Sequence, residues 1–374
     1  MARAPLLHKT TVIIQSAIIR LLRLLLYPFS LLYGLITALR NKLYDWGTLS
    51  AVSFDLPTIA VGNLSMGGTG KTPHVEYLIA LLKSHYRVAT LSRGYNRRTH
   101  GYRLAGPDSD ALEIGDEPMQ FHRKFPDIAV CVGEERVLAL PQLLMDKPET
   151  AVVLLDDAFQ HRSIRPGYNI LLTEHSRLFT RDYIVPFGRL RESRQGYRRA
   201  DCIIVTKCPP ALSEEERLRI TREIAPLPAQ PLYFTALQYG EPYDLFTGAA
   251  VSIPESTALL LVCGIARPAP LQEWLQQRFA SVTLQQFPDH HYFTPADVAE
   301  IRSSWEVLGA EQKMVITTEK DAVKLQLLEA ELRDQALPIC VLPAKVSFLF
   351  DSADSFNNHI FDYVAKALEE QQNP

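Results

Sequence analysis

The fold of this chain is decided by the segment Ser65-Met66-Gly67-Gly68-Thr69-Gly70-Lys71-Thr72. An apolar run, 56–61, precedes it, and a helix-like segment, 75–82, follows it. Strand, glycine-rich loop and helix in this order are the context of a P-loop, whose backbone N–H groups and helix N-terminus bind phosphate oxygens. Lys71 then reaches the β- and γ-phosphates of a nucleotide, and the Thr72 hydroxyl binds Mg²⁺. The cradle for the phosphates consists of Gly67, Gly68, Thr69 and Gly70.

One position departs from the usual P-loop motif. Ser65 stands where the motif has its first glycine. The alternative to a nucleotide site is a glycine-rich loop that only joins a strand to a helix. The Gly-Lys-Thr ending in this context favours the nucleotide site.

Length and composition bound the remaining possibilities. The 374 residues suffice for two domains of ordinary size, and 47% hydrophobic with 22% charged residues is typical of a globular protein. A formal net charge of −3 gives no reason to expect nucleic acid as a partner. The five cysteines are scattered, which indicates reduced thiols and no zinc site.

The N-terminal segment is nearly all apolar from 11 to 43, interrupted by Arg20, Arg23 and Arg40. Its longest uncharged run, 24–39, is shorter than the roughly 20 residues that span a bilayer. We expect a membrane-embedded or interfacial helix, with its arginines reaching lipid phosphates. A short tilted span and a core helix of a soluble domain are the alternatives.

The middle of the chain alternates short apolar runs with helical patterns, which predicts a parallel sheet covered on both faces. The predicted strands are 87–91, 128–132, 151–155, 168–172 and 201–205. The predicted helices are 73–83, 117–124, 134–145 and 213–224. In such folds ligands bind beyond the carboxyl ends of the strands.

A proline-rich stretch, 226–231, predicts a boundary, and a second α/β alternation follows it. Extended pieces are expected at 232–237 and 249–253. Strands are expected at 259–263, 282–286, 314–317 and 339–342, with helices at 269–279, 295–308, 320–332 and 352–369. The predicted organisation has an apolar helical segment, a P-loop domain, linker strands, a smaller α/β domain and a returning strand with a final helix. Their ranges are 1–45, 46–230, 231–255, 256–336 and 337–374.

Two carboxylates, Asp156 and Asp157, follow the predicted strand 151–155. P-loop enzymes place a carboxylate near Mg²⁺ at such a strand end. A helix-capping Asp with a solvated neighbour is the alternative.

Further candidate residues follow other predicted strands. Arg93 and Tyr95 come after 87–91 and suit phosphate and sugar or base, although a solvated loop arginine is an equal possibility. Arg191 and Glu192 lie in an arginine-rich stretch, 189–199, that suits bidentate phosphate binding or a solvated basic face.

Asp116 opens a predicted helix after a turn, and physics alone favours a helix cap over a general base there. His290 and His291 follow Asp289 in the second α/β unit, and suit metal binding, catalysis or a polar loop. Signatures of guanine binding at Thr206–Pro209 and Thr318–Asp321 have the wrong residues or spacing, so GTP is not supported.

Taken in order, these motifs resemble the tetraacyldisaccharide 4′-kinase family of Gram-negative bacteria. The resemblance runs from about residue 12 to the end of the chain. The matching segments are G-N-L-S-M-G-G-T-G-K-T-P, S-R-G-Y, G-D-E-P, D-D-A-F-Q-H-R, G-R-L-R-E, V-T-K-C-P, F-x-D-H-H and T-T-E-K-D-A-V-K.

The resemblance implies transfer of the γ-phosphate of ATP, with Mg²⁺, to the 4′-hydroxyl of a tetraacylated glucosamine disaccharide 1-phosphate, giving lipid IVA. It places the enzyme on the cytoplasmic face of the inner membrane, with the lipid and the membrane surface as partners and no obligatory protein partner evident. It also implies two α/β domains joined by a β-ribbon.

The resemblance also implies roles for single residues. Asp116 is the catalytic base, and one of His290 and His291 is its partner. Lys71 and Thr72 act on phosphate and Mg²⁺, the acidic pair lies near the metal, and Arg191 with Glu192 lies in the cleft. Ala158 replaces a glycine that the family usually has after the acidic pair, which would strain the loop if its φ were positive.

Two other classes of function compete with a lipid kinase. A membrane-associated switch ATPase has a similar P-loop, but its signature first lysine is Met66 here, and it has no need of a D-H-H motif. A lipid-binding scaffold without activity leaves Lys71 and the acidic pair unexplained.

Overall fold

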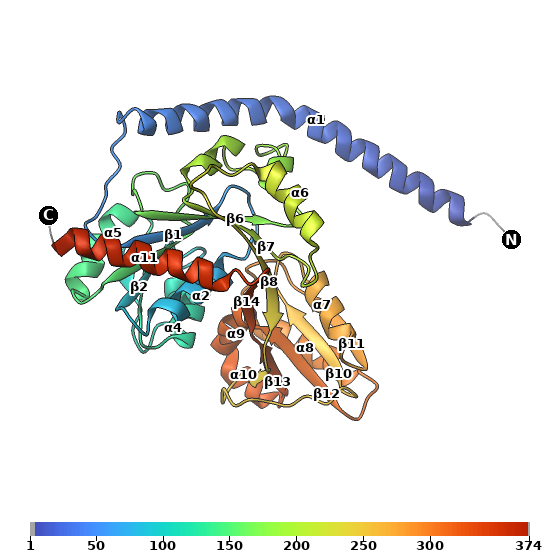
Figure 1. Cartoon of the computed structure of the whole chain (residues 1–374). Helices are drawn as coiled ribbons and strands as arrows, with labels where there is room; N and C mark the ends of the chain where they lie inside the picture. Colours follow the sequence, from blue (N-terminus) through green and yellow to red (C-terminus); the bar gives the residue numbers. More distant parts are fainter. Residues whose placement is uncertain (1–3, 373–374) are drawn as a thin grey trace.

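The computed structural model describes residues 4–372, with side chains described for 25–371. Its larger sheet has the strand order β14-β8-β7-β6-β1-β5-β2-β4-β3, in which the strands from β8 to β4 run parallel and the two edge strands run antiparallel (Figure 1). The strands are β1 (Thr58–Asn63), β2 (Val88–Ser92), β3 (Arg103–Leu104), β4 (Ala129–Val132), β5 (Val152–Asp156), β6 (Tyr168–Glu174), β7 (Cys202–Thr206), β8 (Leu232–Tyr239) and β14 (Ala344–Phe348).

Helices cover both faces of this sheet because its central strands alternate buried side chains between two cores. Ile59 and Val61 of β1 pack in one cluster, and Ala60 packs in another. The first cluster contains side chains of α2 (Lys71–Leu82), α4 (Asp116–Lys124) and α11 (Ala353–Gln372), beside the short α3 (Ala111–Ile114). The opposite face packs against α5 (Arg136–Asp146) and α6 (Glu214–Ile224).

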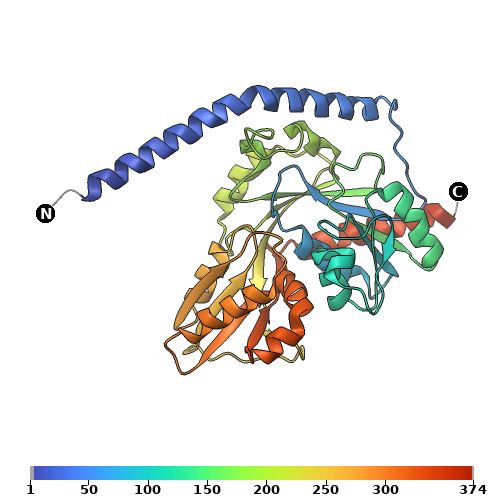
Figure 2. The same cartoon turned by 180° about the vertical axis from the view of Figure 1, so that it is seen from behind.

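The smaller sheet forms a separate unit with its own apolar clusters (Figure 2). Its strands are β11 (Ser281–Gln286), β10 (Ala258–Cys263), β12 (Lys313–Thr318), β13 (Ile339–Leu342) and the antiparallel edge strand β9 (Tyr243–Asp244). Its helices are α7 (Ala269–Gln276), α8 (Pro295–Glu306), α9 (Glu319–Leu325) and α10 (Glu329–Asp334).

An antiparallel ribbon and a partly buried ionic contact join the two units. The chain leaves the larger sheet through β8 and returns through β14, which pairs with it. Beside the ribbon, Lys124 Nζ lies 2.7 Å from Glu76 and 2.8 Å from Glu319, so α2, α4 and α9 meet at one ammonium. Burial and the neighbouring Glu319 raise the pKa of Glu76 to about 7, against the opposing effect of Lys124.

Helix α1 (Ala4–Asp45) runs along the outside of the larger unit (Figure 1). Its C-terminal part is fixed to that unit, because Asn41 donates to Glu192 at 2.7 Å and the Ser30 hydroxyl accepts from Phe187 N at 2.8 Å. Between residues 25 and 39, most of its apolar side chains are exposed, and we call these side chains the apolar surface of α1. They are Leu25, Leu26, Tyr27, Phe29, Leu31, Leu32, Tyr33, Leu35, Ile36 and Leu39.

One of the three readings of the N-terminal segment can now be judged. The exposure of the apolar surface of α1 rules out a buried core helix for 25–39. Across the described residues, no helix has the length and apolarity that crossing a membrane requires.

The α/β architecture with a large parallel sheet and a smaller second unit is as predicted. Three strands were missed, β3, β9 and β14, all antiparallel edge strands without a strong apolar pattern. The helix predicted at 320–332 is wrong as a single element: a 3₁₀ turn, Gln326–Leu328, separates α9 from α10. The extended piece at 249–253 forms only a bridge at Ala250.

Candidate active site

The loop between β1 and α2 has the geometry that backbone phosphate binding requires. Gly67 and Gly70 have φ angles of 105° and 86°, in the left-handed region that strains other residues. Gly70 is the N-cap of α2 and no side chain caps the helix, which leaves its first N–H groups for a ligand. Asn63 and Thr206 hold the loop through hydrogen bonds of 2.7 Å to the hydroxyl and the carbonyl of Thr69.

Lys71 and Asp157 meet at the first turn of α2. Lys71 Nζ lies 3.7 Å from Asp157 Oδ1, and Arg191 Nη1 lies 3.1 Å from both oxygens of the same carboxylate. Burial raises the pKa of Asp157, but the two cations outweigh it and the net shift is downward. Asp157 itself has φ +46°, whereas Ala158 has no positive φ, so the strain expected at Ala158 lies one residue earlier.

Asp156 ends β5 next to the P-loop strand, since it is in register with Val61 of β1. Its side chain is buried, and its Oδ1 has no hydrogen-bond partner in the described part of the chain. Burial, followed by repulsion from Glu117, raises the pKa of Asp156 to about 8, against attraction by Lys71. A cation beside this oxygen would offset the cost of burying the ionised carboxylate.

The neighbouring groups fit a magnesium ion that is bound partly by substrate. Thr72 Oγ1 donates to Glu117 Oε1 at 3.3 Å, so a hydroxyl lies near the same end of α2. Within residues 25–371, no group of three or more His, Cys, Asp or Glu side chains is placed to hold a metal alone. Mg²⁺ characteristically takes one or two protein ligands together with phosphates and water, so Thr72 and Asp156 suit it.

Asp116 contacts the second unit of the protein. It is the first residue of α4 and not its cap, because Gly115, with φ +96°, occupies the cap position. Asp116 Oδ2 lies 2.9 Å from His290 Nδ1, and Oδ1 accepts from Glu117 N at 3.0 Å. His290 reaches it from the loop after β11 with φ +59°. The two units therefore share one acid–histidine pair.

The charge of this acid depends on its partners. Burial raises the pKa of Asp116, but the hydrogen bond from His290 and the nearby ammonium of Lys320 outweigh burial, so the net pKa lies below the usual value. Asp116 is therefore ionised and able to accept a proton.

His291 points away from Asp116. Its Nε2 lies 2.9 Å from Asp297 Oδ2, and its ring stacks on Phe287 with centroids 5.0 Å apart. Of the two histidines in the motif, His290 is thus the one that contacts Asp116.

The four predicted substrate-binding residues are placed differently from one another. Tyr95 is exposed and its ring lies edge-on to His290, with centroids 5.0 Å apart. Arg93 is exposed, and within residues 25–371 its side chain makes no hydrogen bond or ion pair. Arg191 is held by Asp157, as described above.

Glu192 is buried and faces α1. Its carboxylate accepts hydrogen bonds from Asn41, Gln160 and Arg199, between 2.7 and 3.1 Å long. Through these contacts Glu192 fixes α1 to the loop that carries Arg191.

Sequence reasoning missed four residues of the site. Lys207 Nζ donates to Gly68 O at 2.5 Å, Arg136 donates to the carbonyl of Asp156 at 3.2 Å, and Glu117 accepts from Thr72. Lys320 contacts His290. All lie just after strands or in the first turns of helices, and this position in the chain is the signal that could have found them.

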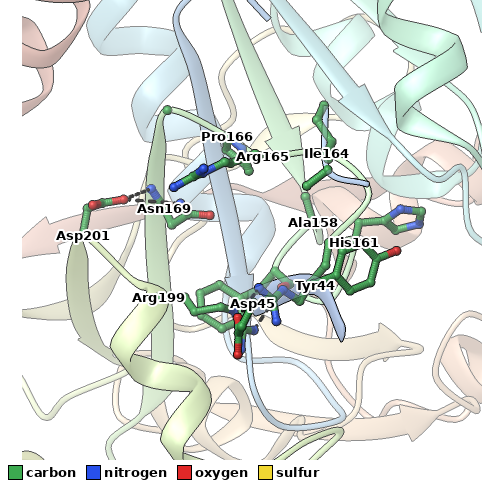
Figure 3. A pocket seen from close by; sticks show the side chains of 14 residues that line it. Tyr44, Asp45, Ala158, His161, Ile164, Arg165, Pro166, Asn169, Arg199 and Asp201 are labelled. Atoms are coloured by element: carbon green, nitrogen blue, oxygen red, sulfur yellow. Dashed lines mark hydrogen bonds and ion pairs between the residues drawn. The ribbon is translucent and has the colours of Figure 1, made fainter. Parts of the chain in front are cut away.

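A cavity of about 520 Å³ lies beside the end of α1 (Figure 3). Ala158 and His161 line it, but Lys71 and Asp116 do not. Its charged residues are largely paired already, as the contact of Asp201 with Asn169 in Figure 3 illustrates. The cavity is therefore separate from the phosphate site.

Comparison with known proteins agrees with this geometry. A curated relative from Bacteroides thetaiotaomicron, named tetraacyldisaccharide 4′-kinase, is 46% identical over 352 residues, covering 91% of this chain and 92% of the relative. One from Flavobacterium johnsoniae with the same name is 44% identical over 350 residues, covering 93% and 99%. The crystal structure of LpxK from Aquifex aeolicus in complex with ATP superposes with a TM-score of 0.71 at 28% identity, covering 92% of this chain and 99% of that chain.

The family described as LpxK, tetraacyldisaccharide-1-P 4′-kinase, matches residues 22–365. Because this match spans most of the chain and the relatives align over nearly their whole lengths, the chain belongs to the tetraacyldisaccharide-1-P 4′-kinase family.

Proposed function

We propose that this kinase uses Asp116 as the base that takes the proton of the acceptor hydroxyl, with His290 holding the carboxylate in place. The reaction is ATP-dependent phosphorylation of the 4′-hydroxyl of a tetraacylated glucosamine disaccharide 1-phosphate, which gives lipid IVA in lipid A biosynthesis. The observation that carries the proposal is the 2.9 Å contact between Asp116 and His290. The next residue in the chain, Glu117, accepts a hydrogen bond from Thr72 of the P-loop, so Asp116 lies close to the proposed phosphate site.

The P-loop binds the phosphates of the nucleotide in this proposal. The backbone of Gly67–Gly70 binds the phosphates, and Lys71 stabilises charge on the transferred phosphoryl group. Thr72 and Asp156 would hold Mg²⁺, which supplies charge neutralisation at the β- and γ-oxygens when bound. Asp157 orients Lys71 and Arg191, since it contacts both.

The acid–histidine pair acts on the hydroxyl of the acceptor. As the 4′-oxygen forms its bond to the γ-phosphorus, the bond from that phosphorus to ADP breaks and the hydroxyl proton passes to Asp116. A carboxylate whose pKa is lowered is a modest base. A modest base is adequate here, because the proton is transferred late in a loose transition state. The proposed contacts to the anionic disaccharide are Tyr95, which lies beside His290, Arg191, which lies beside Asp157, and the exposed Arg93.

The acyl chains call for a site at a membrane surface. The exposed apolar surface of α1 suits partial burial among lipid acyl chains, and its end contacts Glu192 beside the site. We place the enzyme on the cytoplasmic face of the bacterial inner membrane, where ATP is available. The switch-ATPase alternative is not favoured by the family comparison.

The first prediction separates a catalytic base from an acid with a purely structural role. Asp116→Asn should lower kcat by about 10²- to 10⁴-fold with little change in the KM for ATP, because Asp116 contacts the acceptor and not the nucleotide. Asp110→Ala is the matched control, since Asp110 caps α3 through hydrogen bonds to two backbone N–H groups. The control should lower thermal stability by about 1 kcal/mol and leave kcat unchanged. A stability loss without a kcat loss in Asp116→Asn would identify it as structural.

The second prediction concerns the metal. Asp156→Asn should raise the Mg²⁺ concentration required for half-maximal turnover, and excess Mg²⁺ should restore part of kcat by mass action. Asp127→Asn, which changes a surface carboxylate paired with Lys83, should have no such effect. Turnover measured over a Mg²⁺ titration tests this prediction. An unchanged Mg²⁺ requirement in Asp156→Asn would show that this residue does not bind the metal.

The third prediction concerns the membrane. Changing Leu32, Leu35, Ile36 and Leu39 to Ser should weaken binding to phosphatidylethanolamine–phosphatidylglycerol vesicles on the order of 10-fold or more, because the buried hydrocarbon is lost. Flotation of the full chain with vesicles measures this. The matched control changes four exposed apolar residues elsewhere, Leu138, Met145, Leu218 and Val307, to Ser. Equal flotation of both variants would contradict an anchoring role for α1.

A further inference from the structure

Lys320 is the second residue of α9, and its side chain contacts the histidine of the acid–histidine pair. Its Nζ lies 3.0 Å from Asp289 Oδ1 and 3.1 Å from His290 Nε2. The side chain is 19% exposed. The start of α9 is fixed, because Thr318 caps it through Asp321 N.

The chemistry of these groups determines the direction of the hydrogen bonds. An ammonium group has donors and no acceptor, so His290 Nε2 must accept from Lys320. A neutral imidazole then carries its proton on Nδ1, which is the atom that faces Asp116 Oδ2 at 2.9 Å. The three residues thus form one chain of donors that runs from Lys320 through His290 to Asp116.

We propose that Lys320 is a positioning residue that fixes the Nδ1–H tautomer and the orientation of His290, and thereby holds Asp116 in place for the acceptor hydroxyl. The inference rests on the proposed roles of Asp116 and His290. Without the lysine, His290 Nε2 can carry the proton, and the ring would then present an unprotonated nitrogen to the Asp116 carboxylate.

The surrounding charges agree with this role. Asp116 faces His290, Lys320, Lys324 and Tyr292, with Glu117 next to it in the chain. Lys324 is fully buried and lies 2.9 Å from Asp321, so its ammonium is already paired. Burial lowers the pKa of Lys320, but Glu117, Asp116 and Asp289 outweigh it, so the pKa is raised and the lysine is charged.

The test compares Lys320→Met with Lys320→Arg, in which the guanidinium can still donate to Nε2. Lys313→Met is the matched control, because Lys313 lies in the same unit and contacts the carbonyl of Glu306. NMR of the full chain with ¹⁵N-labelled histidine reports the tautomer without substrate, and the loss of one signal set in His290→Gln assigns it. Steady-state kinetics give kcat, the KM for ATP and the pH profile.

Lys320→Met should convert His290 from the single Nδ1–H tautomer to a mixture and lower kcat about 10- to 100-fold with little change in the KM for ATP. The acidic limb of the kcat/KM profile should move to higher pH, because a cation that lowers the pKa of Asp116 is gone. Lys320→Arg should restore much of kcat, and the control should match the parent chain.

Three results would overturn the proposal: an unchanged tautomer in Lys320→Met, an unchanged kcat, or a rise in the KM for ATP with kcat kept, which would mark Lys320 as a phosphate ligand. Failure of the proposed role of Asp116 can be told apart from failure of the proposed role of Lys320. A normal kcat in Asp116→Asn would remove the base, whereas the tautomer measurement needs no turnover.

Discussion

The hydrogen bond between Asp116 and His290 is the contact on which the rest of the site depends, because it joins a helix of the larger unit to a loop of the smaller one. The P-loop, Asp156 and Asp157 all belong to the larger unit, so the proposed nucleotide and Mg²⁺ site lies within that unit. The proposed base and its histidine come from both units. In this account, the contacts that hold the two units together support catalysis as well as stability. Lys124 pairs with carboxylates of α2 and α9, and Arg267 pairs with Glu174 at the end of β6.

A second network links α1 to the phosphate site. Asn41 donates to Glu192, Gln160 donates both to Glu192 and to the carbonyl of Asn63, and Arg191, the residue before Glu192, holds Asp157 beside Lys71. The helix proposed to lie in the membrane surface thus contacts the loop of Arg191, which together with Lys71 is proposed to bind phosphate. This arrangement suits an enzyme whose two substrates differ in phase: ATP comes from water and the acylated acceptor from lipid.

The sequence predicted the parts of the site that depend on local backbone pattern. Glycines with positive φ, a lysine at a helix start and an acid at a strand end follow from short segments, and all are found where expected. The Ser65 departure causes no backbone strain, since Ser65 has no positive φ. Contacts between distant segments could not be predicted from pattern. The choice of His290 over His291, the burial of Glu192 under α1, and the places of Lys207 and Lys320 depend on how two sheets and a helix pack together. The family resemblance supplied the pairing of an acid with a histidine but not which one.

The most direct test of a catalytic pair shared between the two units is a double-mutant cycle on kcat with Asp116→Asn, His290→Gln and the double variant. The account predicts that His290→Gln costs less than Asp116→Asn, and that the double variant is scarcely worse than Asp116→Asn alone, because residues that act as one unit are non-additive. If the two losses multiply independently in the double variant, the acid and the histidine act separately, and the shared pair across the two sheets is contradicted.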